Sequence, residues 1–420
     1  MPAEVFIGLD IGTSGARAVA MSDDGTPLGS ARSEMSDHGP DHRDPKVWLG
    51  AAKAALTELC VSMDRTRVRA ICVDGTSGTM LPIDAEGRPL ASGRMYNDPC
   101  KDPLLLERIA AHAPTTSAAH GATSGLAKVL MLQDTPGATK ILHQADWIAG
   151  HLCGVYASDD NNALKTGYDS IHACWPDWIV ETGARIGLLP EVHRPGTPLG
   201  PLRADVAAEF DLPRETQVLS GTTDGCAAFL ATGAAQPGDG VTSLGTTLVL
   251  KLLSDRPIFA PESGIYSHHI MGLWLAGGAS NTGGGVLLQH FSAAEIERLS
   301  THMTPNAPLG LGYYPLRQPG ERFPIADPHL PVRMTPRPAQ DVNFLQAMLE
   351  GIADVEELGY RKLHDLGGPP LRSVRTVGGG AKNAAWTRIR KRVLAVPMPA
   401  SQNGEAACGA AVLARFGMHQ

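Results

Sequence analysis

The chain has 420 residues, more than one ordinary domain usually holds, so two domains are expected. Hydrophobic residues make up 43% and charged residues 19%, which is enough to build large cores. The formal net charge of −7 argues against binding to nucleic acid or to an anionic membrane, because both need a basic surface. No apolar stretch approaches the roughly 20 residues needed to cross a bilayer.

The cysteines and the start of the chain indicate a cellular setting. Seven cysteines are scattered singly between Cys60 and Cys408, which favours neither a disulfide framework nor a zinc site. The first residues lack the basic character of a secretion signal and lead directly into an apolar run. We therefore expect a reduced, cytoplasmic protein. The one dense basic run, Arg388 to Arg392, is predicted to be a solvated helix face.

Three short strands joined by tight turns are predicted at the start, over Val5–Asp10, Arg17–Met21 and Pro27–Ala31. A helix follows, because Asp44 is a good N-cap and Pro45 suits the first helical position. The apolar stripe of this helix consists of Val47, Trp48, Ala51, Ala55, Leu56 and Leu59.

The next predicted strand, Arg69–Val73, ends in the turn Asp74 to Thr79. Strands followed by helices indicate an α/β fold. Further on, Val218–Ser220 is typical of a strand end, and Cys226–Ala234 can form a helix of small residues.

Much of the opening recurs in the second half of the chain. Strands are predicted at Val241–Leu244 and Leu248–Leu253, followed later by a long helix that Asp341 can cap and a strand at Val374–Val377. The helical stripe consists of Phe344, Leu345, Met348, Leu349, Ile352, Val355 and Leu358. Two related α/β halves are the simplest interpretation.

We place the domain boundary just before this second hairpin. The predicted domains are residues 1–234 and 235–420, with the last helix able to pack back on the first domain. The Pro-rich stretch from Tyr314 to Pro338 is predicted to be a long surface loop.

Two glycine-threonine turns are candidates for binding phosphate. They are Gly12-Thr13-Ser14 and Gly245-Thr246-Thr247. Successive backbone N–H groups in such a turn form a concave anion site, and the hydroxyls add donors. Either turn alone is typical of an ordinary hairpin. Because each opens one half of a duplicated chain, both are predicted to face one polyphosphate.

Two aspartates are candidates for the chemistry. Asp10 ends a buried strand beside the first turn, where it can order Mg²⁺ near phosphates or merely cap the turn. Asp224, in Gly221–Gly225, lies at a predicted helix start, where it can act as a general base or merely as an N-cap.

A third glycine-rich segment, Gly378 to Gly380, lies at a strand-to-helix turn. Its glycines allow a flat ring to lie against the backbone, and Asn383 and Trp386 sit one helical turn apart at its edge. No Walker P-loop motif occurs in the chain, and no convincing Rossmann fingerprint follows an early strand.

In this order the segments resemble the FGGY family of carbohydrate kinases, essentially from end to end. The resemblance is carried by GLDIGTSGARAVAMSDDG (8–25), DPKVWLGA (44–51), DGTSGTML (74–81), a middle region (143–178) that includes Asp146, Asp159, Asn162 and Ala163, SGTTDG (220–225), SLGTT (243–247), PGERFPIADP (319–328), LEGIADVEEL (349–358), VGGGAKNAAW (377–386) and NGEAACGAA (403–411).

The resemblance implies a fold and a set of sites. The fold would be two duplicated ribonuclease H-like domains of the actin/hexokinase ATPase type around a central cleft. ATP would be held with its phosphates near Gly12, Thr13, Ser14, Gly245, Thr246 and Thr247, and its adenine near Gly379, Gly380, Asn383 and Trp386. Mg²⁺ would lie near Asp10 and Asp224.

The resemblance also implies where a sugar would bind. Ser77 and Asp10 are the best candidates to hold sugar hydroxyls, and Asp224 would act as the base for the attacking one. Asp98 occupies the place of a substrate-binding acid in many members, with a simple turn residue as the alternative.

Departures from the family pattern narrow the substrate. The Arg-Glu pair of glycerol kinases and the Met-His-Gly stretch of typical xylulose kinases are absent, and the turn at 74–79 is more like that of the compact ribulose-kinase branch. D-Ribulose is therefore the expected sugar, with D-xylulose next and a polyol or sugar acid still open.

Two alternatives lie outside this class of enzyme. One is a non-catalytic ATP- or sugar-binding sensor, which the intact Asp10, Thr13 and Asp224 disfavour. The other is a chaperone- or actin-like ATPase, which would need a peptide-binding or filament surface. The sequence leaves the oligomeric state open.

Overall fold

The computed structural model describes residues 4–420, which form two compact units. Unit 1 comprises the residues up to Ala231, His268–Gly272 and Asn403–Gln420. Unit 2 comprises Thr232–Ser267 and Leu273–Gln402. The C-terminal segment of the chain thus belongs to the same unit as its beginning, and each unit is described by itself below.

Unit 1 is built on a mixed six-stranded sheet with strand order β3-β2-β1-β4-β10-β9. Its strands are β1 (Val5–Ile11), β2 (Gly15–Ser22), β3 (Pro27–Glu34), β4 (Val68–Gly75), β9 (Pro198–Pro201) and β10 (Gln217–Thr223). Strands β1 and β10 both run parallel to β4, whereas β2 pairs antiparallel with β1. Small two-stranded sheets pair β5 (Met80–Ile83) with β6 (Lys140–His143) and β7 (Ser158–Asp159) with β8 (Val192–His193).

The helices of unit 1 are α1 (Pro45–Val61), α2 (Pro103–His112), α3 (Gly125–Leu132), α4 (Gln144–Cys153), α5 (Asp160–Ala163), α6 (Trp178–Glu181), α7 (Ala204–Phe210), α8 (Asp224–Ala231) and α13 (Ala406–Met418). Helix α1 begins as predicted, because the Asp44 side chain accepts a hydrogen bond from the Lys46 N–H and Pro45 is the first helical residue. Every residue of its predicted stripe is buried.

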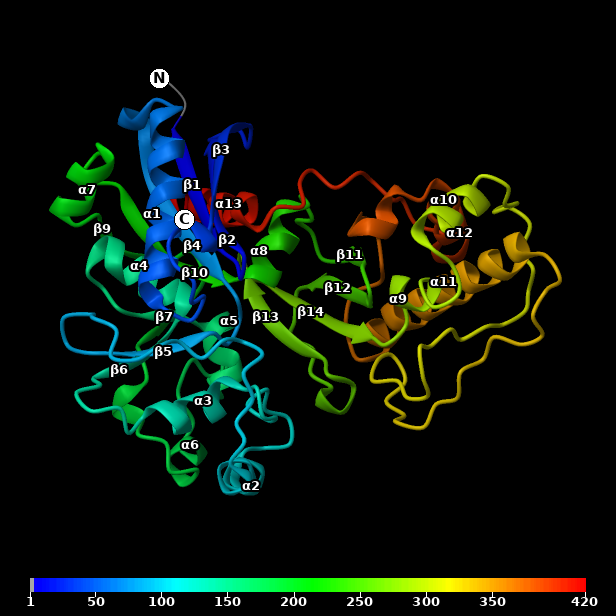
Figure 1. Cartoon of the computed structure of the whole chain (residues 1–420), viewed down its shortest axis with the longest axis horizontal. Coiled ribbons are helices and arrows are strands. Elements are labelled where there is room, and N and C mark those ends of the chain that lie inside the picture. Colours follow the sequence, from blue (N-terminus) through cyan, green and yellow to red (C-terminus); the bar gives the residue numbers. More distant parts are fainter. Residues whose placement is uncertain (1–3) are drawn as a thin grey trace. The chain divides into compact units, whose positions relative to one another are not determined.

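The last helix of the chain covers the sheet of unit 1. Helix α13 packs against α8 and against β1, and Figure 1 shows it in red beside the blue strands. Gly8 of β1 allows this close approach, because a Cβ built there would lie 1.9 Å from the carbonyl oxygen of Ala407. The C-terminal segment therefore belongs to unit 1, and its buried residues cluster with Val19 and Met21 of β2.

Unit 2 contains a five-stranded sheet with strand order β13-β14-β12-β11-β15. Its strands are β11 (Asp239–Leu244), β12 (Leu248–Ser254), β13 (Tyr266–Ile270), β14 (Leu273–Ser280) and β15 (Ser373–Val377). Only the first two residues of β13 belong to unit 2, because His268–Gly272 belong to unit 1. Its helices are α9 (Gly284–Leu287), α10 (Ala293–Ser300), α11 (Asp341–Asp365) and α12 (Ala384–Leu394). The β11–β12 hairpin, with β15 parallel to β11, repeats the arrangement of β1, β2 and β4 in unit 1.

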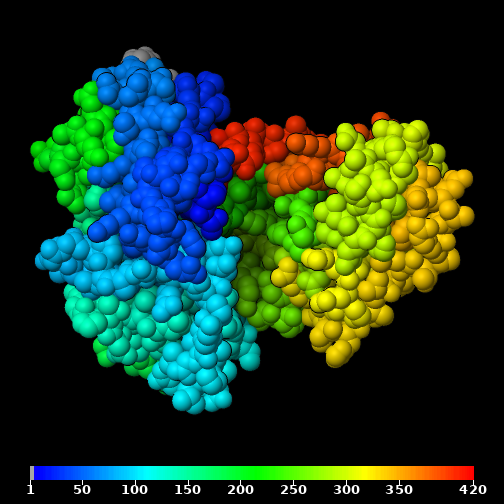
Figure 2. Space-filling model, in the orientation of Figure 1, coloured from blue at the N-terminus to red at the C-terminus, as the bar shows by residue number. Residues whose placement is uncertain are grey.

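Two local expectations in unit 2 need correction. The cap position of α11 is Gln340, and Asp341 is its first helical residue, with its carboxylate bound to Arg337 at 2.6 Å. The Pro-rich stretch from 314 to 338 lacks helices and strands and reaches the surface, where its atoms are yellow in Figure 2. Its side chains Leu316 and Phe323, however, are fully buried, because they complete the apolar core of unit 2.

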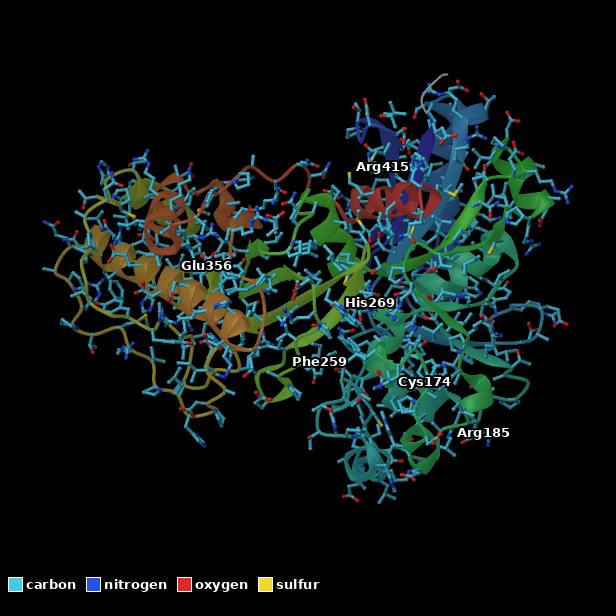
Figure 3. All side chains as sticks on the ribbon, turned by 180° about the vertical axis from the view of Figure 1, so that it is seen from behind. Cys174, Arg185, Phe259, His269, Glu356 and Arg415 are labelled. Atoms are coloured by element: carbon cyan, nitrogen blue, oxygen red, sulfur yellow. The ribbon has the colours of Figure 1, made fainter. Side chains whose placement is uncertain are left out.

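The prediction of a solvated basic face on α12 is wrong for Arg390. Its guanidinium is fully buried and makes two hydrogen bonds of 2.6 Å to the carboxylate of Glu356 on α11. Figure 3 labels Glu356 on this helix. A third hydrogen bond joins Arg390 to the Thr376 hydroxyl at 2.7 Å. Pairing with a carboxylate and a hydroxyl makes burial of this charge possible.

Among residues 4–420, no helix is both long enough and apolar enough to cross a membrane.

Candidate active site

Three parallel strands of unit 1 bring acidic residues together at their carboxyl ends. In the pairing of β1 with β4, Asp10 lies opposite Asp74, and in the pairing of β10 with β4, Thr222 lies opposite the same residue. Asp224 follows directly as the first residue of α8. Gly221 permits this arrangement, since a Cβ there would lie 1.8 Å from the carbonyl oxygen of Val73. The carboxyl edge of such a sheet is the usual place for an active site.

A pocket of about 610 Å³ opens at this edge. It is lined by Asp10, Gly12, Thr13, Ser14, Arg17, Thr76, Ser77, Tyr96, Lys165, Asp224, Gly225, Ala228, Gly404, Glu405 and Ala406. The structure therefore brings Asp224, the predicted base, Asp10, the predicted metal- and substrate-binding acid, the first glycine-threonine turn and Ser77 into one pocket, which we call the unit 1 pocket.

Asp10 is buried, with one cation nearby. Its carboxylate accepts a hydrogen bond from Arg17 at 3.3 Å, and Arg17 also pairs with Glu405 at 3.4 Å. Burial raises the pKa of Asp10, and the Arg17 guanidinium opposes this rise while the charge of Asp224 adds to it.

Asp74 is fully buried, and its carboxyl oxygens accept no hydrogen bond from an N–H or hydroxyl group of the described residues, although a hydrogen bond with the neighbouring Asp10 carboxyl contributes to its raised pKa. Burial raises the pKa of Asp74 well above its usual value, and the charges of Asp10 and Asp224 raise it further. The raised pKa favours the uncharged form of this carboxyl. It was not predicted as a site residue, although its place in the Asp74–Thr79 turn was a usable signal.

Asp224 occupies the start of α8 without serving as its cap. The capping bond is made by Thr223, whose hydroxyl accepts from the Cys226 N–H at 3.3 Å. The Asp224 carboxylate accepts from the adjacent Gly225 N–H at 2.7 Å. Because another residue supplies the cap, this observation favours a chemical role over the N-cap alternative.

Ser77 has the features of a ligand-binding residue. Its hydroxyl oxygen is buried and has no hydrogen-bond partner, although the residue lines the unit 1 pocket. The following Gly78 has a φ of +88°, which lets the chain turn sharply there. A buried hydroxyl without a partner is uncommon in a protein and indicates a place for a ligand group.

Asp98 lies elsewhere. It does not line the unit 1 pocket; its carboxylate binds the guanidinium of Arg43 at 2.7 and 3.3 Å and accepts from the Met95 N–H at 2.8 Å. The hydrogen bond from Arg43 lowers the pKa of Asp98. These contacts are those of a loop-anchoring residue, the alternative that the sequence left open.

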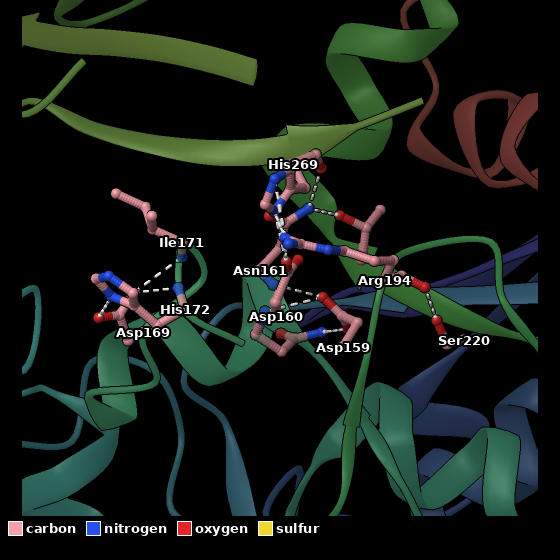
Figure 4. Close-up of polar contacts among 11 residues, drawn as sticks. Asp159, Asp160, Asn161, Asp169, Ile171, His172, Arg194, Ser220 and His269 are labelled. Carbon is pink, nitrogen blue, oxygen red and sulfur yellow. Dashed lines mark hydrogen bonds and ion pairs between the residues drawn. The ribbon is translucent and has the colours of Figure 1, made fainter. Parts of the chain in front are cut away.

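The middle region of the chain also supports the local structure of unit 1. The Asp159 carboxylate caps α5 by accepting from the N–H groups of Asn161 and Asn162, each at 2.9 Å. The neighbouring Asp160 pairs with Arg194 and with His269, both at 2.6 Å (Figure 4). These acids are therefore engaged by protein groups.

In unit 2, the second glycine-threonine turn joins β11 to β12. Its carbonyl groups hold the start of α9, because Gly284 N–H donates to Gly245 at 2.8 Å and Gly285 N–H donates to Thr246 at 3.0 Å. Thr247 completes the turn. The repeated strand-turn-strand arrangement gives this turn the same place in its sheet as Gly12–Ser14 in unit 1.

A second pocket, of about 670 Å³, lies within unit 2. Its lining includes Ile296, Ser300, Gly379, Lys382, Asn383 and Arg388. The Asn383 side chain accepts from the Trp386 N–H at 3.0 Å and donates to the Ser300 hydroxyl at 2.8 Å. The wall of this pocket is thereby fixed at the start of α12.

Two residues predicted beside the adenine do not line this pocket. The ring of Trp386 is buried in the apolar core of unit 2, and Gly380 packs on it, because a Cβ there would lie 2.7 Å from the ring. The structure thus brings Gly379 and Asn383 to the pocket and places Trp386 beneath its wall.

Several residues of the unit 1 pocket escaped prediction, namely Arg17, Thr76, Tyr96, Lys165 and Glu405. Tyr96 lies two positions before Asp98, which was predicted as a candidate substrate-binding residue. Glu405 comes from the far end of the chain, in the segment NGEAACGAA (403–411), which carries part of the family resemblance but from which no site residue was predicted.

Solved structures share this architecture. A xyloylose kinase from Brucella ovis matches with a TM-score of 0.84 at 25% identity, covering 99% of this chain and 91% of that one. A glycerol kinase with ADP from Plasmodium falciparum matches with a TM-score of 0.82 at 16% identity, covering 99% and 90%. The fold is thus that of the ribonuclease H-like ATPases of the actin and hexokinase type.

The family follows from the sequence itself. Residues 5–104 match the N-terminal domain of the FGGY family of carbohydrate kinases, and residues 240–418 match its C-terminal domain. The chain belongs to this family and is a carbohydrate kinase, so the family implies ATP as the phosphate donor. The resemblance read from the ten segments is thereby confirmed.

Curated relatives include kinases of different sugars. A xylulose kinase of Klebsiella pneumoniae is 23% identical over 446 residues, covering 99% of this chain and 90% of its own. A gluconokinase of Bacillus subtilis is 20% identical over 451 residues, covering 98% and 87%.

Proposed function

We propose that this carbohydrate kinase phosphorylates the terminal hydroxyl of a ketopentose, with D-ribulose as the first candidate. The observation that carries this proposal is the unit 1 pocket, where Asp224, Asp10 and the partnerless hydroxyl of Ser77 meet. A sugar offers several hydroxyls, and carboxylates and hydroxyls are suitable partners for them.

In this proposal Asp224 is the general base. It accepts the proton of the attacking hydroxyl as the γ-phosphoryl group is transferred in line. Ser77 and Asp10 hold other hydroxyls of the sugar, so that one oxygen faces the base. Positioning and charge neutralisation supply most of the catalysis in phosphoryl transfer.

The glycine-threonine turns are proposed to hold the phosphates. Thr13 and Ser14 in unit 1 and Thr246 and Thr247 in unit 2 offer hydroxyl and backbone N–H donors. The unit 2 pocket, with Gly379 and Asn383, is the proposed adenine site. These assignments are supported by the equivalent places of the two turns in their sheets.

Mg²⁺ fits the acids that are present. Residues 4–420 contain no cluster of three or more His, Cys, Asp or Glu side chains arranged to hold a metal. Mg²⁺ is commonly held by only one or two carboxylates together with phosphate oxygens and water. Asp10 and Asp224 would hold it in this way, and the ion would neutralise charge on the phosphates.

D-Xylulose is the second candidate. It is favoured by the names of several relatives, whereas D-ribulose is favoured by the Asp74–Thr79 turn and by the absence of the Met-His-Gly stretch. The two sugars differ in the orientation of one hydroxyl, which a pocket built for hydrogen bonding can discriminate strongly.

The test is ADP release from MgATP with D-ribulose, D-xylulose, L-ribulose, glycerol and gluconate. A saturable response to D-ribulose with the highest kcat/KM supports the proposal. A higher kcat/KM for D-xylulose establishes the second candidate, and a preference for glycerol or gluconate overturns both.

A further inference from the structure

Lys128 is a fully buried lysine in the first turn of α3. Its ammonium donates to two backbone carbonyls, that of Thr123 at 2.7 Å and that of Tyr96 at 3.2 Å. Both partners are neutral, so no carboxylate accepts these hydrogen bonds. Burying a cation in this way is costly, and such a position requires a reason.

The carbonyl of Tyr96 belongs to the wall of the unit 1 pocket. Tyr96 lines this pocket with 44% of its surface exposed, and its backbone is held on both sides. On one side its N–H donates to the hydroxyl of Thr79 at 3.0 Å, and on the other side its carbonyl accepts from Lys128. Two buried side chains therefore determine where Tyr96 stands.

The same ammonium lies close to the turn that carries Ser77. A Cβ built on Gly78 would lie 3.9 Å from the Lys128 nitrogen and 3.9 Å from the Thr123 carbonyl oxygen. Lys128 thus stands where three segments meet: the turn after β4, the segment with Tyr96 and the segment before α3. Two of these segments supply lining residues of the unit 1 pocket.

We propose that Lys128 is a positioning residue of this pocket, whose ammonium fixes the Tyr96 segment and thereby sets the affinity for the acceptor sugar. This inference rests on the proposed function only in taking the unit 1 pocket as the sugar site. Lys128 is not a catalytic residue here, because the groups it binds are backbone carbonyls of the wall.

An apolar side chain could not replace this function. Lys128→Met keeps a similar length but leaves the carbonyls of Tyr96 and Thr123 without their buried donor, which favours displacement of both segments toward water. A displacement of about 1 Å at a positioning group can change catalytic efficiency about 100-fold. Lys128→Arg retains the charge and the donors, although in a bulkier group.

The first test is a steady-state comparison of wild type, Lys128→Met, Lys128→Arg and Lys53→Met. Lys53 is the matched control, because it pairs with Glu209 at 2.7 Å and does not line the pocket. We expect Lys128→Met to raise the KM for the sugar about 10- to 100-fold, with a change in kcat and in the KM for ATP below about 3-fold.

The conservative variant sharpens this test. Lys128→Arg is expected to recover part of the sugar KM, and Lys53→Met to keep the wild-type value. Equal losses in the KM for ATP and the KM for the sugar, or an unchanged sugar KM in folded Lys128→Met, would overturn the proposal.

A second measurement reports directly on the mobility of the backbone around Tyr96. Hydrogen–deuterium exchange of the amides in residues 94–98 is expected to be faster in Lys128→Met than in wild type and in Lys53→Met. Unchanged exchange would contradict the proposed anchoring. This measurement does not require that the protein accept any sugar. If the wild type shows no sugar-dependent ADP release, the proposed function is wrong, but the exchange rates still test the role of Lys128.

Thr79→Val gives an independent variant if Lys128→Met does not fold. It removes the hydroxyl that accepts from Tyr96 N–H, so it is expected to raise the sugar KM and to accelerate exchange of the same segment. In the double variant with Lys128→Arg the effects on KM should fall short of multiplicative, because both act on one segment. Fully independent effects would count against a shared role.

Discussion

The buried carboxylate of Glu356 in unit 2 receives two hydrogen bonds of 2.6 Å from Arg390, whereas the buried carboxyl of Asp74 in unit 1 receives none from an N–H or hydroxyl group of residues 4–420. Thr242 and Tyr360 extend the network in unit 2 through their hydroxyls. In unit 1 the neighbours of Asp74 are two further acids, Asp10 and Asp224. Both regions bury charge-bearing side chains beside a central sheet.

The difference separates a structural network from a functional one. A buried ion pair is tolerated when all its donors and acceptors are engaged, and it then resists the removal of either partner. Asp10 and Asp74 lie beside Asp224, and burial raises the pKa of both Asp10 and Asp74, a pattern that is common at functional sites. We therefore expect substitutions in unit 1 to affect turnover and substitutions in the Glu356–Arg390 network to affect stability.

The largest effect is expected from Asp224→Ala. Removing a general base lowers kcat by about 10²- to 10⁴-fold, whereas the affinity for ATP should change little. Steady-state ADP release with the preferred sugar gives kcat, and equilibrium binding gives the affinity for ATP. Stability should remain close to that of wild type, since Thr223 supplies the cap of α8.

The control for this variant is Asp205→Ala, which removes an exposed acid paired with Arg203. It is expected to keep the wild-type kcat. If Asp224→Ala retains turnover, Asp224 is not the general base, and the acids of unit 1 would no longer be distinguished from the Glu356–Arg390 network by a role in catalysis.

Arg390→Met tests whether the Glu356–Arg390 network stabilises unit 2. It leaves the carboxylate of Glu356 buried without its cation, which typically costs about 3–5 kcal/mol. We expect this loss in the opening free energy of β11 and β15, measured by hydrogen exchange of their amides. The double variant with Glu356→Leu should regain much of it, because no uncompensated charge remains.

Arg361→Met is the matched control on the same helix. Arg361 pairs with Glu357 at 3.2 Å on an exposed face, so its loss should cost less than about 1 kcal/mol. A loss in Arg390→Met no larger than in this control would show that the buried network contributes little.

The fold could be predicted from the sequence where local patterns and burial coincide. The Asp44-Pro45 start of α1 and the apolar stripe of α11 are examples, because capping chemistry and helical periodicity act within a few residues. The basic run on α12 misled prediction, since the partner of Arg390 lies on α11, 34 positions away. Pairing over such a separation has no local signature.

The residues of the candidate site also differ in whether a local sequence pattern predicts them. Asp10 and Asp224 could be found because each ends or follows a strand beside a glycine turn, and parallel strands gather such ends. Glu405 and Lys165 reach the unit 1 pocket only through the tertiary fold. Asp98 and Trp386 had suggestive places in the sequence, but in the structure Asp98 binds Arg43 and Trp386 packs in the apolar core of unit 2.

The comparison can be sharpened further by the pH dependence of stability at Asp74. A carboxyl whose pKa is raised in the folded state binds more protons there than in the unfolded chain, so its contribution to stability is complete below the unfolded pKa of 3.8 and declines as pH rises toward the folded pKa. Asp74→Asn is neutral at every pH, nearly isosteric and still able to donate a hydrogen bond.

We therefore expect Asp74→Asn to gain stability over wild type as pH rises from 4.5 to 7, by at most about 1.4 kcal/mol per pH unit. Urea unfolding at several pH values measures this difference. Asp24→Asn is the control of opposite sign, because hydrogen bonds from Ser22 and Thr26 lower the pKa of Asp24 to about 2. Its stability relative to wild type should fall as pH rises from about 2 to 3.8 and stay level at higher pH. A constant difference for Asp74→Asn would mean that this carboxyl is charged in the folded protein, and Asp74 would then need a cationic partner of the kind that Arg390 gives Glu356.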